Sequence, residues 1–371
     1  MISISEELST SPYEQGDESG IVELLDLVFE GWPRFDLLGS RLDHWLWKYK
    51  ENYIKQKIVV VTKKGDSIIG CIHSVPQEIK ILNRIHPFFL GGDVAVHPDF
   101  RKLGVYNRNL ELITKLRKES GSAFIIAITG NPIIIDAFDR SKDFLRLPFE
   151  LTHYIYVKDI DLHLKMNPRD DAWIQKIGFH ILKNISGLSR RRSSTEKYSS
   201  ELVIKEIFEF DARIDEFWLA VQEAYDLIVV NNKKYLNWRY CDPRAGGFKV
   251  LAIEEKGKIL GFTVLRINKY REDYPVGFIV ELMSIPGRPE VVSVLINKAV
   301  SFFLENNVNI INFLAVKGYK HHDVLTSYGF LDSHRNHFIY NSPLQGIDYM
   351  KDVAESPMDR IHLSWGILDV V

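Results

Sequence analysis

The chain has 371 residues, more than one compact α/β domain of ordinary size needs and typical of two. Its 47 basic and 49 acidic residues give a formal net charge of −2, so no global charge draws it to nucleic acid or to an anionic membrane. Cys71 and Cys241 are far apart in the sequence, which favours neither a disulfide framework nor a zinc site. Residues 2–15 lack the blocks of a signal peptide, and no apolar run approaches the roughly 20 residues that span a bilayer. We therefore expect a cytoplasmic protein with no nucleic-acid and no membrane partner.

The first predicted elements are a helix and a β-hairpin. Apolar residues recur at helical spacing over residues 21–29, which predicts a helix with one buried face. Trp47-Lys48-Tyr49 then precedes two apolar runs at residues 58–61 and 68–75, joined by a charged, glycine-bearing turn at residues 63–66. Two such runs around a short turn are typical of a hairpin.

A strand, a basic turn and a helix follow at residues 91–121. The apolar strand at residues 94–96 runs through His97-Pro98-Asp99-Phe100 into Arg101-Lys102-Leu103-Gly104-Val105-Tyr106 and an amphipathic helix. The first-turn amides of such a helix have no partners within it and carry the positive end of its dipole, so they can bind a phosphate. Arg101 adds a permanent charge, and Gly104 lets the backbone approach a ligand closely. The segment therefore predicts an anion-binding turn.

The order of elements then repeats. A strand at residues 123–128, a helix after Asn131-Pro132 and a strand at residues 153–157 complete the first copy. The interval from Trp47 to Gly70 in the first hairpin equals that from Trp238, in Trp238-Arg239-Tyr240, to Gly261 in the second. The repeat predicts an α/β (α+β) fold with two tandem mixed sheets flanked by helices.

The expected boundaries are a first domain at residues 1–160, a helical linker at residues 161–200, and a second domain with a C-terminal tail at residues 201–371. The linker contains Arg190-Arg191-Arg192, which could steer an anionic acceptor but is more typical of a solvated loop. In the second copy Pro286-Gly287-Arg288-Pro289 replaces the basic turn, and Pro289 lacks an amide that an anion site needs. Only the first domain is therefore expected to bind a phosphate group.

The segment Val94-Ala95-Val96-His97-Pro98-Asp99-Phe100-Arg101-x-x-Gly104-Val105 resembles the acetyl-coenzyme A signature of the GNAT N-acetyltransferase superfamily. It departs from the usual form because Lys102 stands where many members have Gly, and Tyr106 replaces a final Gly or Ala. The chain is also similar to tandem-domain GNAT proteins of bacteria and archaea, often encoded near surface-polysaccharide genes. That similarity rests on Gly92-Asp93 with its strand, on Tyr-Leu-Asn-Trp-Arg-Tyr-Cys-Asp-Pro at residues 235–243, and on the tail at residues 365–371.

This resemblance implies direct transfer of an acetyl group from acetyl-coenzyme A to the amine of a small acceptor, such as an amino sugar or a nucleotide-linked sugar. It implies that the signature strand pairs with the pantetheine arm and that the basic turn binds the pyrophosphate. The coenzyme-binding residues that it implies are Val94, Ala95, Val96, Arg101, Lys102, Leu103, Gly104, Val105, Tyr106 and Asn131. No metal is expected, and the oligomeric state stays open.

The catalytic groups are less well defined. Asp93, directly before the signature strand, is a candidate general base, although a turn-capping carboxylate is an equally good interpretation. In some other tandem GNAT enzymes the terminal carboxylate of the chain is the base, so Val371 is a second candidate, with a strand edge or a mobile end as the alternative. Phe138 stands near the place where many GNAT enzymes have a Tyr acid, which leaves Tyr106, Tyr154 or water for that role.

Other features favour structural interpretations. His321-His322 and the pair His334 and His337 could suggest a metal, but they are more typical of surface or strand-end histidines. The repeated motif of Trp, a basic residue and Tyr is interpreted as core packing between helix and hairpin.

Two other classes of function stay open. One is an aminoacyl-tRNA-dependent peptidyl transferase of the peptidoglycan-bridge type, which the coenzyme signature and the lack of a long helical arm disfavour. The other is a non-catalytic coenzyme A-binding module, which the missing Tyr acid keeps open.

Overall fold

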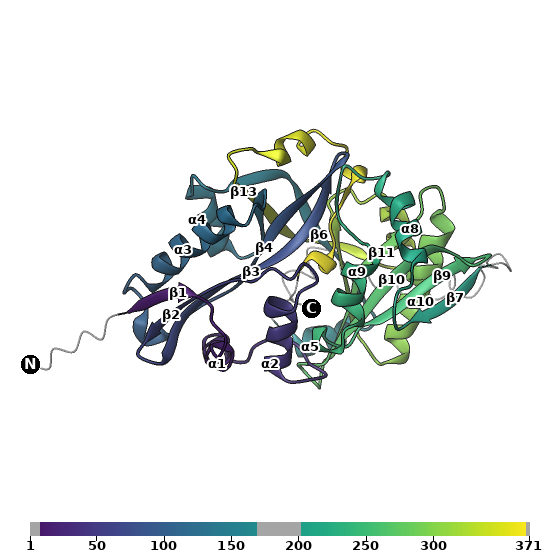
Figure 1. Ribbon diagram of the computed structural model, residues 1–371. Helices are drawn as coiled ribbons and strands as arrows, with labels where there is room; N and C mark the ends of the chain where they lie inside the picture. Colours follow the sequence, from purple (N-terminus) through teal and green to yellow (C-terminus); the bar gives the residue numbers. More distant parts are fainter. Residues whose placement is uncertain (1–7, 169–201, 369–371) are drawn as a thin grey trace, which may run out of the picture.

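The computed structural model describes residues 8–168 and 202–368 (Figure 1). Most of the expected linker, its arginine run at residues 190–192, and Val371 lie outside the described residues. The elements of the first half are β1 (Ser9–Pro12), α1 (Glu18–Phe29), α2 (Arg41–Trp45), the π-helical turn η1 (Leu46–Lys50), β2 (Ile58–Lys64), β3 (Ser67–Ile81), β4 (Arg84–Val96), η2 (Pro98–Phe100), α3 (Val105–Glu119), β5 (Phe124–Thr129), α4 (Pro132–Arg140), β6 (Leu145–Val157) and α5 (Ile160–Met166).

The second half repeats this order with additions at its end. Its elements are β7 (Val203–Ile207), α8 (Arg213–Gln222), β8 (Leu227–Val229), α9 (Lys233–Leu236), the π-helical turn η4 (Asn237–Cys241), η5 (Pro243–Ala245), β9 (Lys249–Glu255), β10 (Lys258–Asn268), β11 (Val276–Ser284), α10 (Pro289–Glu305), β12 (Ile310–Val316), α11 (His322–Ser327), β13 (Leu331–Pro343), η6 (Tyr349–Val353), η7 (Met358–Arg360), β14 (Ile361–His362) and η8 (Trp365–Ile367). Each helix within the described residues is too short or too polar to cross a membrane.

The predicted fold class is confirmed, but the two expected sheets form one. Fourteen strands make a single mixed sheet with the path β1-β2-β3-β4-β5-β13-β6-β12-β11-β10-β9-β7, and β8 and β14 pair off this path. Within each half one pair on the path is parallel, β4 with β5 and β11 with β12. Helices cover the sheet on both faces (Figure 1).

The two halves are joined because each contributes its last long strand to the other. β13, from the second half, lies between β5 and β6 and is antiparallel to both. β6, from the first half, is in turn antiparallel to β12 of the second half along its length from Leu151 to Val157. The sheet therefore continues across the middle of the molecule, and its central strands come alternately from the two halves.

The repeated Trp motifs meet at this junction. The indole rings of Trp47 and Trp238 stack with centroids 4.8 Å apart and planes 19° apart. Each indole nitrogen donates to the backbone carbonyl of the other tryptophan, at 2.8 Å from Trp47 and 3.3 Å from Trp238. The motif is buried in the core, as predicted, but its partner is the other copy of the motif, in a reciprocal contact.

The two faces of the sheet are packed differently. On one face α3 covers the first half through Ile113, and α10 covers the second half through Leu295 and Phe303. On the other face both halves share one apolar cluster, which includes Ile21 of α1 and Trp365 of the tail. The space between the halves is therefore mostly a common core.

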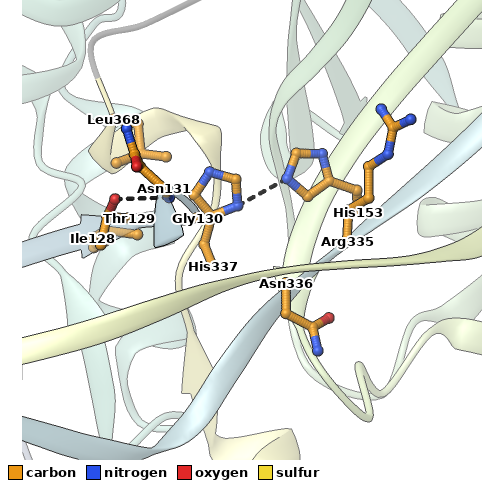
Figure 2. A pocket seen from close by; sticks show the side chains of 9 residues that line it. All are labelled: Ile128, Thr129, Gly130, Asn131, His153, Arg335, Asn336, His337 and Leu368. Carbon is orange, nitrogen blue, oxygen red and sulfur yellow. Dashed lines mark hydrogen bonds between the residues drawn. The ribbon is translucent and has the colours of Figure 1, made fainter. Parts of the chain in front are cut away.

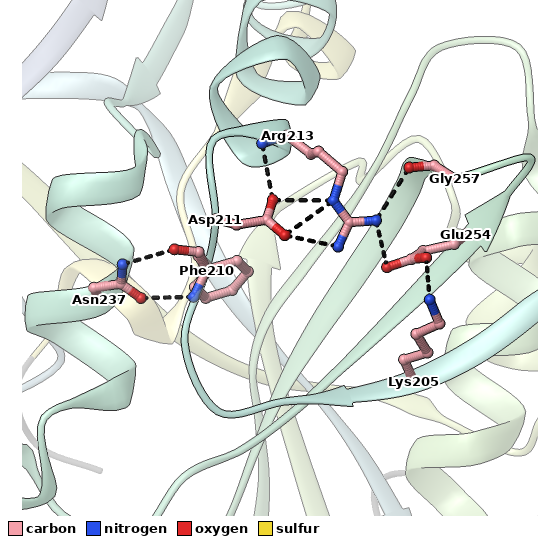
Figure 3. A network of polar contacts seen from close by, with 7 residues as sticks. All are labelled: Lys205, Phe210, Asp211, Arg213, Asn237, Glu254 and Gly257. Atoms are coloured by element: carbon pink, nitrogen blue, oxygen red, sulfur yellow. Dashed lines mark hydrogen bonds and ion pairs between the residues drawn. The ribbon is translucent and has the colours of Figure 1, made fainter.

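A polar network fixes the outer end of the second half (Figure 3). The carboxylate of Glu254, a buried residue, forms ion pairs with Lys205 at 2.6 Å and with Arg213 at 3.0 Å. The side chain of Asn237 exchanges hydrogen bonds with the backbone of Phe210 at 2.8 and 3.0 Å. The ion pairs hold β7 and the start of α8 to β9, and the Asn237 bonds tie the segment before α8 to the π-helical turn η4.

Candidate functional site

A wedge opens between β4 and β5 in the first half. The two strands pair only over Phe88–Leu90 and Phe124–Ile126, although β4 continues to Val96 and β5 to Thr129. Past Leu90, the edge of β4 that faces β5 has no strand partner within the described residues. Such an edge can accept an extended, amide-bearing ligand as an additional strand.

A β-bulge accounts for the divergence of the two strands. Gly92 and Asp93 together lie opposite one residue of β3, His73, because the register shifts between Ile72 and Ser74. A bulge bends its strand and increases the local twist. The indole of Trp45 donates to Nε2 of His73 at 3.0 Å, so Nδ1 carries the hydrogen and donates to the carbonyl of Asp93 at 2.8 Å. The neutral imidazole thus holds the bulge in place.

The basic turn at the end of β4 has the geometry of an anion site. Lys102 and Gly104 both have left-handed backbone angles, with φ of 68° and 78°. Gly104 is the N-cap of α3, and no side chain caps the first turn of that helix. Arg101, Lys102, Leu103 and Tyr106 are exposed around it. The left-handed angle at Lys102 gives a physical reason why glycine suits this position in many family members.

Asp93 lies beside the wedge and is held in an ion pair. Its Oδ2 accepts from Nζ of Lys48 at 2.9 Å and from the hydroxyl of Tyr49 at 2.6 Å. Burial alone would raise the pKa of this carboxyl, but the charge of Lys48 and the Tyr49 hydrogen bond outweigh burial and lower the pKa. A carboxylate with a lowered pKa is a weaker base than an ordinary aspartate.

A cavity of about 540 Å³ lies at the carboxyl end of β5 (Figure 2). Its walls come from both halves because β13 and the tail contribute to it. The lining residues are Ile128, Thr129, Gly130, Asn131, His153, Arg335, Asn336, His337 and Leu368. Asn131 was predicted to bind coenzyme; it lines this cavity and its side chain caps α4 by accepting from the amide of Ile133 at 3.0 Å.

Two histidines of the cavity were missed by the sequence interpretation. His153 on β6 and His337 on β13 form a hydrogen bond of 2.9 Å between Nε2 and Nδ1 (Figure 2). Burial lowers the pKa of His153 to about 3 and also lowers the pKa of His337. The expectation that His337 is a surface or strand-end residue is therefore wrong, since the strand exchange brings it to the inside of the site.

The tyrosines predicted as alternatives for the general acid lie outside the cavity wall. Tyr154 is buried in the core of the second half, and burial raises its pKa to about 12. Phe138 stacks on Phe144, with ring centroids 4.3 Å apart, and has no acidic group. Tyr106 lies exposed at the start of α3, next to the basic turn rather than in the cavity wall.

The equivalent wedge of the second half is filled by the chain itself. β11 and β12 pair only over Val276–Ile279 and Ile310–Phe313, as β4 and β5 do in the first half. Trp365 packs edge-on against Phe278 of β11, with ring centroids 5.5 Å apart. Arg239 donates to the carbonyls of Gly366 at 3.3 Å and Leu368 at 2.7 Å. Tail residues 365–368 thus occupy the space that is open in the first half.

An acidic residue anchors the tail in this second wedge. Glu281 lies three residues before Ser284, which pairs with Gly261, just as Asp93 lies three residues before Val96, which pairs with Gly70. Its carboxylate accepts from the hydroxyl of Ser364 at 2.7 Å and lies 2.8 Å from Nε2 of His362. The two acidic bulge residues are therefore equivalent, but one holds a lysine and the other holds the tail.

Residues 9–128 match the family model described as acetyltransferase (GNAT) domain. None of the curated protein sequences matches the chain. Several solved structures share its fold over most of its length. One is a conserved protein of unknown function from Enterococcus faecalis V583, a probable N-acyltransferase, with a TM-score of 0.60 and 11% identity over 91% of this chain and 72% of that one.

Two further structures show the same likeness. N-myristoyltransferase of Saccharomyces cerevisiae with bound myristoyl-CoA has a TM-score of 0.58 and 11% identity, over 92% of this chain and 79% of its own. A GCN5-related N-acetyltransferase from Anabaena variabilis has a TM-score of 0.55 and 9% identity, over 91% of this chain and 73% of its own. The family match identifies residues 9–128 as a GNAT acetyltransferase domain, and the solved structures share their fold with most of the chain.

Proposed function

We propose that the chain is an N-acetyltransferase that moves an acetyl group from acetyl-coenzyme A to the amine of a small acceptor. The observation that carries this proposal is the open wedge between β4 and β5, with the basic turn at the end of β4 and the cavity at the end of β5. In this assignment the pantetheine arm lies in the wedge and its pyrophosphate lies on the turn.

The residues of the turn divide the work of binding the coenzyme. Backbone groups of Val94 and Val96, on the open edge of β4, pair with the pantetheine amides. The amides of residues 103–106 and the positive end of the α3 dipole face the pyrophosphate, and Arg101 and Lys102 add charge. Ala95 and Val105 are buried beneath the strand and the turn and support them. Asn131 lies at the end of the wedge, where it caps α4.

The cavity is the proposed site of the acceptor amine. Its volume of about 540 Å³ lies within the range of small-molecule sites, roughly 300–1,000 Å³. Its surface is mostly apolar, but Asn131, Arg335, Asn336 and two histidines supply polar groups for the hydroxyls of an acceptor such as an amino sugar or a nucleotide-linked sugar. Both halves contribute to the walls, so acceptor specificity is set by the second half as much as by the first.

The reaction is a direct attack of the neutral amine on the thioester carbonyl. Asp93 and Val371 are the candidates for removing the first proton from the acceptor ammonium. The ion pair of Asp93 with Lys48 makes its carboxylate a weak base and better suited to holding the bulge and the wedge open. Leu368, the last described residue of the tail, lines the cavity, and Val371, outside the described residues, stays the second candidate.

The anion-binding turn predicts the effect of two substitutions. Arg101→Ala removes one charge-assisted contact, worth about 1.5–3 kcal/mol, and should weaken acetyl-coenzyme A binding roughly ten- to hundredfold. Gly104→Val should have a similar effect because valine strongly disfavours a φ of 78°. Lys115→Ala, on the exposed face of the same helix, is the matched control. Calorimetric titration in which both variants keep wild-type affinity would contradict the assignment.

The filled second wedge predicts the stoichiometry. Calorimetric titration should give one acetyl-coenzyme A per chain, because tail residues 365–368 occupy the equivalent space in the second half. The same titration on Gly104→Val should show this one site with weakened affinity and reveal no other. A second site that survives Gly104→Val would show that the tail does not exclude coenzyme.

The function itself is tested by thiol release from acetyl-coenzyme A across a panel of amines, including amino sugars. With an amine that turns over, Asp93→Asn should keep kcat within about tenfold of wild type, since loss of a true base costs ~10²-fold or more. The same measurement of kcat is made on a variant that lacks Val370 and Val371. A ~10²-fold loss of kcat there, with coenzyme affinity kept, would assign the base to the tail; the same loss in Asp93→Asn would return it to Asp93.

A further inference from the structure

The wall of the cavity contains a pair of imidazoles, His153 and His337. His153 and His337 lie on adjacent antiparallel strands, β6 and β13, where Leu151 is opposite His337. Their rings are 4.8 Å apart at 25°, and the edge of Trp365 packs on His153 at 5.0 Å. One strand comes from each half, so the pair exists only when the two halves are joined.

One nitrogen of each ring takes part in the hydrogen bond between the two histidines, and the other nitrogen of each ring, here called the outer nitrogen, points away from it. Nε2 of His153 and Nδ1 of His337 share a single hydrogen at 2.9 Å. Within residues 8–168 and 202–368, the outer nitrogens, Nδ1 of His153 and Nε2 of His337, make no hydrogen bond to protein. A neutral pair of this kind has one outer nitrogen with a bare lone pair and one that carries a hydrogen.

The outer edge of His337 faces the end of β5. A Cβ added at Gly130 would lie 3.3 Å from Cε1 and 3.4 Å from Nε2 of His337, and 3.2 Å from the carbonyl of Asn336. Because residue 130, directly after β5, is glycine, no side chain at this position covers the edge of the ring. Nε2 of His337 is thus open toward the cavity at the point where the wedge between β4 and β5 ends.

Few charges surround the pair. Arg335 and Asp332, both on β13, act on His153 in opposite directions. Asp332 accepts a hydrogen bond from Thr152, and Glu150 of β6 accepts one from Asn336. Burial is the only cause that lowers the pKa of His337. Both rings are therefore neutral at pH 7 and able to accept a proton.

We propose that His337 carries the proton of the transfer reaction and that His153 is the residue that positions it. As the amine nitrogen bonds to the acyl carbon, Nε2 of His337 takes one proton from that nitrogen. As the carbon–sulfur bond breaks, the same proton passes to the coenzyme thiolate, which leaves as the free thiol. The amide product and the neutral imidazole remain, so atoms and charge balance. Nδ1 of His337 donates its hydrogen to Nε2 of His153 throughout the reaction. In the neutral ring, Nε2 of His337 therefore carries no hydrogen before the amine attacks.

This assignment rests on the proposed function and supplies the acid that the sequence lacks. The lowered pKa of His337 suits a shuttle, because the imidazolium it forms readily gives its proton to a thiolate. Many family members have a Tyr acid where this chain has Phe138. Here one imidazole both removes the proton from the amine and delivers it to the thiolate, so no Tyr acid is needed.

The first test reads the tautomer and needs no acceptor. Protein labelled with ¹⁵N in its histidine rings gives long-range proton–nitrogen correlations that distinguish bare from protonated nitrogens, and His337→Gln identifies the His337 signals. At pH 7, with acetyl-coenzyme A bound, His337 should be neutral with its hydrogen on Nδ1. In His153→Leu this preference should be lost. A hydrogen on Nε2 of His337, or a charged ring, would overturn the proposal.

The second test measures turnover with an amine identified by the thiol-release panel. His337→Gln should lower kcat by ~10²-fold or more and leave the affinity for acetyl-coenzyme A unchanged. His153→Leu should lower kcat by less, and His153→Gln, which can still accept from Nδ1, should recover part of the loss. His334→Gln, an exposed histidine of the same strand, is the control.

The outcomes distinguish failure of the role of His337 from failure of the proposed acetyltransferase activity. Full kcat in His337→Gln, or a loss explained by weaker coenzyme binding, would overturn the role of His337 while the acetyltransferase stands. If acetyl-coenzyme A binds but no amine of the panel releases thiol in the wild type, the proposed function fails, and the tautomer measurement still decides whether His337 has the bare nitrogen that the proposal requires.

Discussion

The pairing of β13 with β5 and β6 is the contact on which the site depends. A parallel pair such as β4 and β5 can diverge only if the second strand is held firmly on its other side, and β13 supplies that support along β5 from Phe124 to Thr129. Without it, β5 would carry unpaired backbone groups on both edges, which is costly for a strand. The wedge, the cavity and the histidine pair all lie at this one place in the sheet.

The exchange of strands also explains how two similar halves come to do different work. Both carry a bulge with an acidic residue, Asp93 or Glu281, beside a π-helical turn with a Trp, a basic residue and a Tyr. In the first half the basic residue neutralises the carboxylate and the wedge stays open. In the second half Arg239 instead binds tail carbonyls, and Glu281 holds Ser364. The second half thereby provides a wall of the cavity, and its own wedge is filled by the tail.

Local features of the sequence predicted much of this fold. Hairpins, amphipathic helices and the basic turn each depend on a few consecutive residues, and the interval from Trp to Gly in each copy indicated the repeat. The residues of the turn could be named because Gly104 and its neighbours follow a strand directly. The two copies of the Trp motif could be assigned to the core because the same Trp and Tyr recur at the same place in both copies.

The remaining features depend on contacts between distant residues, for which a single sequence carries no signal. The order of strands at the junction places His337 next to His153, and nothing near residue 153 or 337 marks either as part of a cavity. The ion pair of Asp93 is formed with Lys48, far away in the sequence, so its effect on the basicity of the carboxylate could not be read locally. The sequence predicted the tail as a candidate source of the base, with a strand edge or a mobile end as the alternative, and not as the filling of the second wedge, because that space is created by the divergence of β11 from β12.

We propose that the wedge between β4 and β5 holds the acyl donor and opens into the histidine-lined cavity. A crystal structure of the complex with acetyl-coenzyme A would locate the donor. We expect the pyrophosphate on the amides of residues 103–106, the pantetheine arm along the open edge of β4, and the thioester at the mouth of the cavity, with His337 the nearest imidazole. Coenzyme bound between β11 and β12 with the tail displaced, or a thioester directed away from the cavity, would contradict it.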